Sequence, residues 1–508
     1  MRKKFYFPIF SNLFLFIAWA TLIFPVYANN NNGLDSALSP CRIKGLENDV
    51  RCGSITVLEN PSAAHTTNGR RIAIHYAVIP AKASRRDPDP LFVFAGGPGQ
   101  SAIKIAPAVQ GIFAKLNRRR DIVFIDQRGT GKSNALDCPA EGRALMLIRV
   151  DAPAHDARTA AKKCLDALQT HAAPAFYATT FAMADIEAVR LRLGYKQINL
   201  WGASYGTRAA LEYARLYPYV VRSMVLDGVA PAGMGIPVSF TFDAEAALAR
   251  LSAECAAENG CLVKAAQGKD SLVVRLERLS ESLVTPRRLT VADPVTGELL
   301  SLEITRDIAL GAVFASLYVP SLAALTPAIV DQALQGNFAP MLTLVDTFEN
   351  GASSNLSTGM RLSVLCAEDW PRLSKETLQE AEAHRPFGPA LIHELAQQCE
   401  IWPRTKVDEA YYLPLKSDIP TLLFSGGADP ATPPRHAEAV AKNLRRAKHI
   451  IAPHLSHGVS SQGCAPDLIT RFVESADLLQ ADGKCLAKLP RPLFYSAPQA
   501  KTLQGKAQ

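Results

Sequence analysis

The chain has 508 residues and a formal net charge of +8; 20% of its residues are charged and 48% are hydrophobic. The basic residues are spread along the chain, and a solvated helix end explains the densest run, residues 118–120, better than nucleic-acid binding does. Beyond residue 28 no stretch approaches the ~20 uninterrupted apolar residues of a membrane span, so we expect no stable membrane insertion of the mature protein.

The first 28 residues have the pattern of a secretory signal peptide. Residues 2–4 are basic, residues 13–24 form an apolar run, and the small side chains of Val26 and Ala28 fit cleavage after Ala28. Removing the three basic residues lowers the net charge to +5. An uncleaved membrane anchor is the alternative, but the short apolar run and the cleavage pattern favour a signal peptide. The sequence therefore predicts an exported protein, periplasmic or secreted.

Ten cysteines in an exported chain predict disulfide bonds. A metal site is the rival interpretation, but the chain contains no Cys-x-x-Cys motif. Pairing the cysteines in chain order closes five local loops, although order alone does not prove the connectivity. The predicted pairs are Cys41–Cys52, Cys138–Cys164, Cys255–Cys261, Cys366–Cys399 and Cys464–Cys485.

Short apolar runs alternate with helical patterns from Arg71 onward, after an Asn-rich stretch, residues 29–40, that we expect to be a loose leader. Short runs that are apolar almost throughout are typical of parallel strands buried on both faces. Because helical patterns such as residues 182–193 and 207–216 lie between them, the order favours an α/β sheet flanked by helices. The predicted strands are residues 72–79, 91–94, 122–125, 198–201, 224–226, 421–424 and 449–451.

The alternation breaks off after residues 224–226 and resumes only at Thr421. The segment between them is mainly helical, as at residues 244–257 and 375–384, and holds a hairpin around residues 293–297. A long insert that leaves a sheet and returns to it is typical of a cap that shapes a binding site, here placed after the sixth core strand. The predicted parts are a core of residues 29–231 and 416–488, a cap of residues 232–415 and a tail of residues 489–508.

The strongest chemical signal is Gly202-Ala203-Ser204-Tyr205-Gly206, which lies between a predicted strand and a predicted helix. In that context Gly-x-Ser-x-Gly is typical of a nucleophile elbow, a sharp turn that exposes a serine hydroxyl. The glycines leave room for strand and helix to approach, and the helix start offers backbone N–H groups to a developing negative charge. We therefore predict that Ser204 is a nucleophile.

A serine nucleophile needs a base, and the base needs an acid that orients it. Asp429 follows a late core strand and is the predicted acid; Asp227, after the preceding strand, is the rival, for which a structural turn role is favoured. His457 follows the next strand and precedes Gly458, which permits a tight turn, so His457 is the predicted base. His454, nearer the strand, is the rival base.

An oxyanion-binding loop is predicted at Ala95-Gly96-Gly97-Pro98-Gly99, directly after the strand at residues 91–94. Three glycines and a proline keep side chains away and define a backbone that can aim an N–H group at the reacting carbonyl. We predict that the N–H groups of Gly96 and Tyr205 form the oxyanion hole. A plain turn at the end of the strand is the alternative.

The stretch Asp126-Gln127-Arg128-Gly129-Thr130-Gly131-Lys132-Ser133 ends like a phosphate-binding P-loop. A P-loop requires glycine where this chain has Asp126, so we predict that no nucleotide binds here. Asp126 and Arg128 are instead expected to brace neighbouring loops through charge-assisted hydrogen bonds.

Taken together, the motifs resemble those of the α/β-hydrolase serine peptidases of the prolyl aminopeptidase and tripeptidyl aminopeptidase group. The resemblance covers about residues 70–475, and the segment at residues 364–369 is closer to the exported tripeptidyl type. The prolyl enzymes usually carry His where this chain has Ala95, which weakens a strict proline-iminopeptidase assignment. The resemblance implies an α/β-hydrolase fold. The matching pieces are residues 96–99, 126–129 and 202–206, Asp429 with Pro430 and Thr432, and His457 with Gly458.

The resemblance also implies a serine aminopeptidase that cleaves peptide bonds near a free N-terminus, releasing tripeptides or single residues. A carboxylate in the cap could recognise the substrate ammonium group in a partly dry site. Glu368 is the first candidate and Asp369 the second, with Cys366, bridged to Cys399, anchoring the segment. The alternative is that both acids are surface charges or salt-bridge partners.

Two further functions stay open from the sequence. An esterase acting on small esters would use the same triad. A non-catalytic binding protein on the same scaffold would be expected to have a damaged triad or oxyanion loop, whereas this chain has a complete set. We expect peptide substrates, no nucleic acid or nucleotide ligand, and no metal or organic cofactor.

Overall fold

The computed structural model describes residues 38–495 except 48, 63–68, 140–149, 151–155, 259–260, 262–269, 294–295, 349–355 and 385. The predicted signal peptide, most of the predicted leader and the end of the tail lie outside the described residues. In the part of the chain that the structure describes, no helix combines the length and apolar character that a membrane crossing requires.

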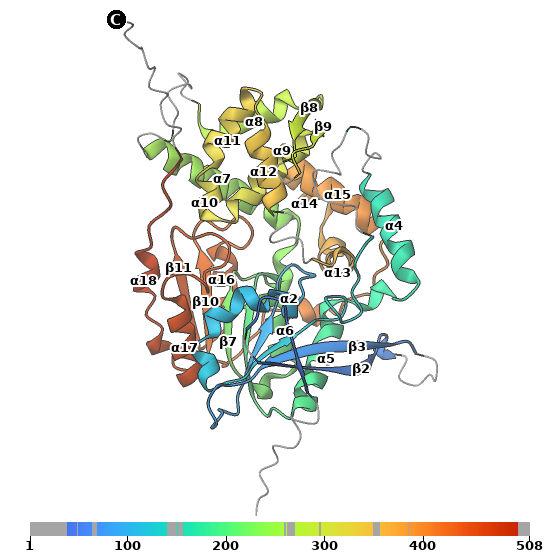
Figure 1. The fold of residues 1–508 in the computed structure, drawn as a ribbon, viewed down its shortest axis with the longest axis vertical. Helices are drawn as coiled ribbons and strands as arrows, with labels where there is room; N and C mark the ends of the chain where they lie inside the picture. Colours follow the sequence, from blue (N-terminus) through green and yellow to red (C-terminus); the bar gives the residue numbers. More distant parts are fainter. Residues whose placement is uncertain are drawn as a thin grey trace, which may run out of the picture.

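A nine-stranded sheet forms the centre of the molecule, with strand order β1-β2-β3-β5-β4-β6-β7-β10-β11 (Figure 1). Neighbours from β5 to β11 run parallel, and β1, β2 and β3 are added in antiparallel pairs. The α/β prediction is confirmed, and each predicted strand is present. The strands are β1 (Ser39–Cys41), β2 (Val50–Leu58), β3 (Arg71–Ile79), β4 (Leu91–Phe94), β5 (Ile122–Ile125), β6 (Ile198–Ala203), β7 (Val221–Asp227), β10 (Thr421–Gly426) and β11 (Ala447–Ala452).

Helices cover both faces of the sheet because its central strands are apolar on both sides. On β6, Leu200 packs into the cluster that includes α5 and α6, whereas Trp201 packs into the opposite cluster with α2 and α17. This is the two-sided burial expected of parallel strands. The first cluster includes residues of α4 (Ala157–Gln169), α5 (Thr179–Leu193), α6 (Tyr205–Leu216) and α16 (Pro434–Ala441), and the second includes residues of α2 (Ala102–Val109), α17 (Ala465–Ser475) and α18 (Lys484–Ala487).

Strands β1 and β2 were not predicted, and two corrections follow. Residues 39 and 40, expected to belong to the loose leader, lie in β1, where Ser39 pairs with Cys52 beside the Cys41–Cys52 disulfide. β2 was missed because it lies near the sheet edge and alternates intermediate and exposed positions rather than forming an apolar run. The insert therefore follows the seventh strand in chain order rather than the sixth.

The segment between β7 and β10 is mainly helical and gathers on one side of the sheet (Figure 1). It has an apolar cluster of its own, which includes Leu248, Val313 and Phe338. The described end of the tail packs onto this insert, since Phe494 joins the cluster and Tyr495 donates its N–H to Ala324. The elements are α7 (Val238–Ala257), α8 (Leu272–Ser282), β8 (Arg287–Ala292), β9 (Leu299–Ile304), α9 (Arg306–Leu317), α10 (Pro320–Ala323), α11 (Thr326–Leu334), α12 (Ala339–Phe348), α13 (Thr358–Val364), η8 (Leu365–Asp369), α14 (Lys375–Ala383) and α15 (Gly388–Ile401).

All ten cysteines lie within the described residues and are paired. The five disulfides are the ones predicted from chain order, so each closes a local loop. They are Cys41–Cys52, Cys138–Cys164, Cys255–Cys261, Cys366–Cys399 and Cys464–Cys485.

The stretch that resembles a P-loop is an internal brace. The Asp126 carboxylate accepts hydrogen bonds from the Ser101 hydroxyl at 2.5 Å and from the N–H groups of Ile103 and Lys132, both at 3.1 Å. A Cβ at Gly131 would lie 2.0 Å from this carboxylate, so the turn requires glycine there. The Lys132 N–H is therefore directed at a side chain of the protein, and those of Gly129, Thr130 and Ser133 are directed at carbonyls of the same stretch, whereas a P-loop directs its N–H groups at phosphate.

Arg128 in the same stretch is buried, with 1% of its surface exposed. Its guanidinium makes a two-pronged ion pair with Asp185, at 2.6 and 2.7 Å, and also donates to the carbonyls of Glu59 and Phe176, both at 2.8 Å. These bonds join β2, α5 and the loop after β5. Lys132, in contrast, is exposed.

We expect Arg128→Ala to lower the free energy of unfolding by about 3 kcal/mol, because it leaves the buried Asp185 carboxylate without its cation. The matched surface variant Lys132→Ala should change it by less than about 0.5 kcal/mol. Urea unfolding of both variants tests the difference. Equal effects, or a rise in melting temperature on adding ATP, would contradict the bracing role.

Candidate active site

Ser204 lies at a one-residue turn between β6 and α6. Its φ of 55° and ψ of −128° are strained for a residue with a side chain. The glycines on either side permit the turn, because a Cβ at Gly202 would lie 2.4 Å from the Gly206 carbonyl oxygen and one at Gly206 would lie 2.1 Å from that of Phe94. The local geometry is thus that of a nucleophile elbow.

The predicted oxyanion loop lies against this turn. A Cβ at Gly96 would be 3.3 Å from the Ser204 Cβ, so the two residues are close neighbours. Gly97 and Gly99 have φ values of 107° and 109°, which favour glycine. The N–H of Tyr205 belongs to the first residue of α6, where helix geometry leaves the N–H group without an acceptor inside the helix. Donation from Gly96 and Tyr205 to an oxyanion stays a prediction.

His457 and Asp429 lie together at the carboxyl edge of the sheet. The imidazole Nδ1 is 2.8 Å from the Asp429 Oδ2, and because a carboxylate only accepts, Nδ1 is the donor. That tautomer leaves Nε2 of His457 as the acceptor nitrogen. Asp429 also accepts from the N–H groups of Ala431 and Thr432, at 2.8 and 2.9 Å, and from the Thr432 hydroxyl at 2.7 Å.

The two partners stabilise each other's charged forms. Burial alone would raise the pKa of Asp429, but the charge and hydrogen bond of His457, with the N–H groups of Thr432 and Ala431, outweigh it and lower that pKa. Burial alone would lower the pKa of His457, but Asp429, and Asp227 behind it, raise that pKa above its ordinary 6.5. This arrangement suits a base that becomes positively charged during a reaction.

The rival residues have other surroundings. The Asp227 carboxylate accepts the N–H groups of Val459 and Ser460, whereas Asp429 contacts the His457 ring. His454 is half-buried, and its Nδ1 has no hydrogen-bond partner among the described residues. The structure therefore brings the Asp429 carboxylate to His457 rather than to His454.

The insert contacts the loop that carries His457 and the predicted oxyanion loop. The Tyr318 ring lies edge-on to the His457 ring, with centroids 5.1 Å apart and planes at 70°. The Ser456 hydroxyl donates to the carbonyl of Leu317 at the end of α9. On the other side, Ser357 donates its N–H to the Gly99 carbonyl at 2.9 Å. Neither Tyr318 nor Ser357 belongs to a motif, so sequence reasoning missed both.

Helix α7 of the insert also contacts the loops that carry Asp429 and His457, the predicted acid and base. Arg250 donates to the carbonyl of Gly427 at 2.8 Å and to that of Pro453 at 2.7 Å. Asp243, earlier in α7, pairs with Arg435 at 2.7 Å and with His436 at 2.8 Å, beside the start of α16. These bonds tie α7 to the strand ends.

Glu368 and Asp369 lie on the π-helical turn η8 and are buried, with 0% and 1% of their surface exposed. Arg208, one helical turn after Ser204 on α6, donates to both oxygens of Asp369, at 2.8 and 3.1 Å, and lies 3.5 Å from Glu368. Both acids thus have salt-bridge partners within the protein, as the alternative interpretation expected, but neither is a surface charge. Cys366, bonded to Cys399 of α15, anchors the turn.

The Glu368 carboxylate also accepts the Thr179 N–H at 2.6 Å and the Tyr411 hydroxyl, and burial raises its pKa although Arg208 opposes the rise. The Thr179 hydroxyl lies 2.8 Å from that of Tyr205, which also accepts from Gln127. The acidic turn is therefore joined to the residue after Ser204. Two carboxylates share one guanidinium, so the cluster has a formal excess of one negative charge.

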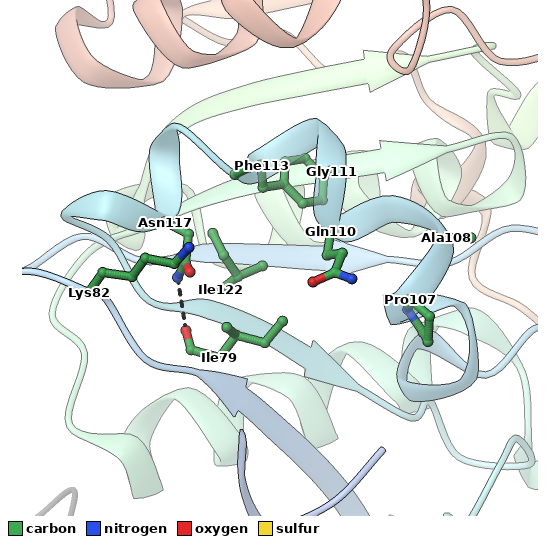
Figure 2. Close-up of a pocket in the computed structure, with 10 residues that line it drawn as sticks. Ile79, Lys82, Pro107, Ala108, Gln110, Gly111, Phe113, Asn117 and Ile122 are labelled. Atoms are coloured by element: carbon green, nitrogen blue, oxygen red, sulfur yellow. Dashed lines mark hydrogen bonds between the residues drawn. The ribbon is translucent and has the colours of Figure 1, made fainter. Parts of the chain in front are cut away.

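No group of three or more potential metal ligands occurs among the described residues. A pocket of about 310 Å³ lies between Phe113, Asn117 and Ile122. Figure 2 shows the residues that line it. Ile122 begins β5, whereas Ser204 follows the end of β6, so in a parallel sheet this pocket lies at the opposite edge from Ser204. It is therefore separate from the candidate active site.

Two family models match the chain. Residues 89–253 match the alpha/beta hydrolase fold, and residues 366–485 match the TAP-like protein family. The first match contains the predicted oxyanion loop and the turn at Ser204, and the second contains Glu368, Asp369, Asp429 and His457.

Among proteins of known name, the chain is 24% identical to serine protease Hip1 of Mycobacterium tuberculosis over 484 residues, covering 88% of this chain and 90% of that protein. It is 27% identical to the tripeptidyl aminopeptidase of Streptomyces lividans over 198 residues, 36% of each chain. It is 29% identical to the proline iminopeptidase of Neisseria gonorrhoeae over 140 residues, 28% of this chain and 32% of that protein. The chain thus has the α/β-hydrolase fold and is a serine hydrolase, and its residues 366–485 match the TAP-like family.

Proposed function

We propose that this serine hydrolase is an exported aminopeptidase that cleaves peptides near a free N-terminus. The observation that carries the proposal is the His457–Asp429 pair, 2.8 Å apart, on loops at the same sheet edge as the Ser204 elbow. The likeness to a serine protease over most of the chain, and to a tripeptidyl aminopeptidase over part of it, supports peptides as the substrate.

In the proposed mechanism Ser204 attacks the scissile carbonyl while Nε2 of His457 takes the hydroxyl proton. His457 then gives that proton to the leaving amine, and a serine ester remains. Asp429 holds Nδ1–H and stabilises the imidazolium. The N–H groups of Gly96 and Tyr205 receive the oxyanion. Water activated by His457 hydrolyses the ester, and no step requires a metal or organic cofactor.

Export to the periplasm or the medium belongs to the same proposal. Its support is that all ten cysteines form disulfides, which persist in oxidising compartments. The predicted signal peptide lies outside the described residues.

The insert, residues 232–415, is proposed to act as a cap that limits entry to short peptides and free N-termini. Its support is that the insert contacts the loops around the proposed site: Tyr318 packs against His457, and Ser357 donates its N–H to Gly99. An insert that encloses the Ser204 turn on both sides would exclude internal segments of a folded protein substrate from the site.

Glu368 is proposed to recognise the substrate ammonium group, with Asp369 as the second candidate. The support is the excess negative charge of the buried cluster and its link to Tyr205 through Thr179. π-Helical turns are rare and occur frequently at functional sites. Glu368 is fully buried, so direct contact with the ammonium group requires a shift of η8. Without such a shift, the charge of Glu368 would act on the ammonium group through the Tyr411 hydroxyl, which donates to Glu368.

We expect a fluorophosphonate probe to label the wild-type protein and not Ser204→Ala, because only the activated hydroxyl attacks phosphorus. The substitution should lower kcat by about 10⁴-fold or more and leave the melting temperature close to that of the wild type. Gel fluorescence and thermal unfolding measure the two effects. A folded wild type that is not labelled would favour a binding protein on the hydrolase scaffold.

The peptidase proposal predicts turnover of aminoacyl- or tripeptidyl-arylamides with free amines. Peptides of graded length, analysed by mass spectrometry, then give the number of residues released. Good turnover of N-blocked small esters together with no turnover of either arylamide would replace the peptidase by an esterase.

Glu368→Gln should lower kcat/KM for a free-amine tripeptidyl-arylamide about tenfold relative to its N-acetylated form, because it removes the charge that attracts ammonium. The control is Glu212→Gln, a buried glutamate on α6 that pairs with Arg215 rather than with Arg208. The control should lower kcat/KM equally for the free-amine and the N-acetylated substrate. The same result for Glu368→Gln would mean that Glu368 only holds the structure together.

A further inference from the structure

Asp227 contacts both the turn at Ser204 and the loop that follows His457. Its backbone carbonyl accepts the N–H of Ser204 at 2.9 Å. Its carboxylate accepts the N–H of Val459 at 3.0 and 2.9 Å and that of Ser460 at 2.7 Å, directly after His457 and Gly458 in the chain. We propose that Asp227 is a positioning residue, which holds the nucleophile turn and the histidine loop in register and faces His457 with a negative charge. The proposal rests on the proposed function of Ser204 and His457.

The strand order explains why one residue reaches both loops. Asp227 ends β7, which lies between the elbow strand β6 and the acid strand β10, and it pairs with Ala203 on one side and Phe424 on the other. The next residue, Gly228, has a φ of 64°. A Cβ there would lie 2.8 Å from the Thr432 hydroxyl and 3.4 Å from the His457 ring. The turn after Asp227 is thus shaped to admit the ring.

The charge of Asp227 has no basic partner among the described residues. The carboxylate is buried, with 2% of its residue surface exposed, and it accepts hydrogen bonds from the N–H groups of Val459 and Ser460 and from the Ser460 side chain, none of which carries a charge. A buried carboxylate without a cation is unfavourable, and burial raises the pKa of Asp227, which the N–H groups and the charge of His457 oppose. Protonated His457 is therefore the cation that this charge can stabilise.

The competing explanation is that Asp227 only holds the two loops in place. The two explanations differ in whether the charge of Asp227 affects His457. The groups that contact the His457 ring are the Asp429 carboxylate, the Thr432 hydroxyl, 3.1 Å from Nδ1, and the Tyr318 ring from the insert. The Asp227 carboxylate lies behind them, next to Gly228, and acts on the ring through its charge. Replacing Asp227 by asparagine keeps the shape and removes the charge, so the pKa of His457 should fall. Because the base acts only when neutral, reaction should then begin at lower pH.

The test is the rate of fluorophosphonate labelling of Ser204 between pH 4 and pH 9, which does not depend on knowing the substrate. Relative to the wild type, Asp227→Asn should label about 10- to 100-fold more slowly at the plateau, with the onset moved to lower pH. The matched control is Asp185→Asn, which also neutralises a buried carboxylate, but one that pairs with Arg128 and makes no contact with the Ser204 turn or the histidine loop among the interactions of the described residues. It should lose stability and keep the wild-type onset.

The outcomes are separable. No labelling of the wild type would defeat the proposed function, whereas a labelled wild type with an unchanged onset in Asp227→Asn would overturn this inference alone. If Asp227→Asn does not fold, Asp227→Glu keeps the charge and displaces it. That variant should retain the onset and label more slowly, and labelling at the wild-type rate would overturn the positioning role.

Discussion

The backbone crossing at the elbow is the constraint on which the rest of the site depends. β6, α6 and the end of β4 approach so closely that Gly202 and Gly206 have no room for a side chain, and Ser204 takes up the strain of the turn. Such strain persists only where surrounding structure holds it. Here the holding groups are the sheet neighbours themselves, since Asp227 of β7 accepts the N–H of Ser204.

Around this crossing, three arginine side chains connect elements that are distant in the chain, and two of them, Arg128 and Arg208, are buried. Arg128 joins the loop after β5 to α5, Arg208 joins α6 to η8, and Arg250 joins the insert to the acid and histidine loops. Each guanidinium can bond in several directions at once, which a lysine ammonium does less precisely. Buried pairs add little net stability, but breaking one is costly, so they specify arrangement more than they add stability.

The sequence was sufficient for the features that rest on local pattern. Apolar runs identified the parallel strands, and glycine spacing identified the turn at Ser204 and the loop at Gly96. Chain order identified the disulfides, since all five close short loops. Asp429 was preferred over Asp227 from its place after a late strand, and the ring contact agrees with that choice.

The missing features depend on contacts between distant segments. Strand β2 is half exposed and leaves no apolar run. Tyr318 and Arg250 belong to ordinary helical sequence, and only the folded insert brings them to His457 and Gly427. The two acids at residues 368–369 were visible in the sequence, but Arg208, the cation that pairs with them, lies 161 residues before Asp369 in the chain. Sequence spacing carries no information on such pairings.

The attachment of α7 has a consequence for how this scaffold can diversify. Arg250 of the insert donates hydrogen bonds to the carbonyls of Gly427 and Pro453, which lie on the loops that carry Asp429 and His457. An insert exchanged as a whole for that of another hydrolase would leave both carbonyls without those donors. Recombination between hydrolase genes that changes substrate selectivity should therefore exchange only the part of the insert that follows α7. Helix α7 would then stay with the core that it contacts.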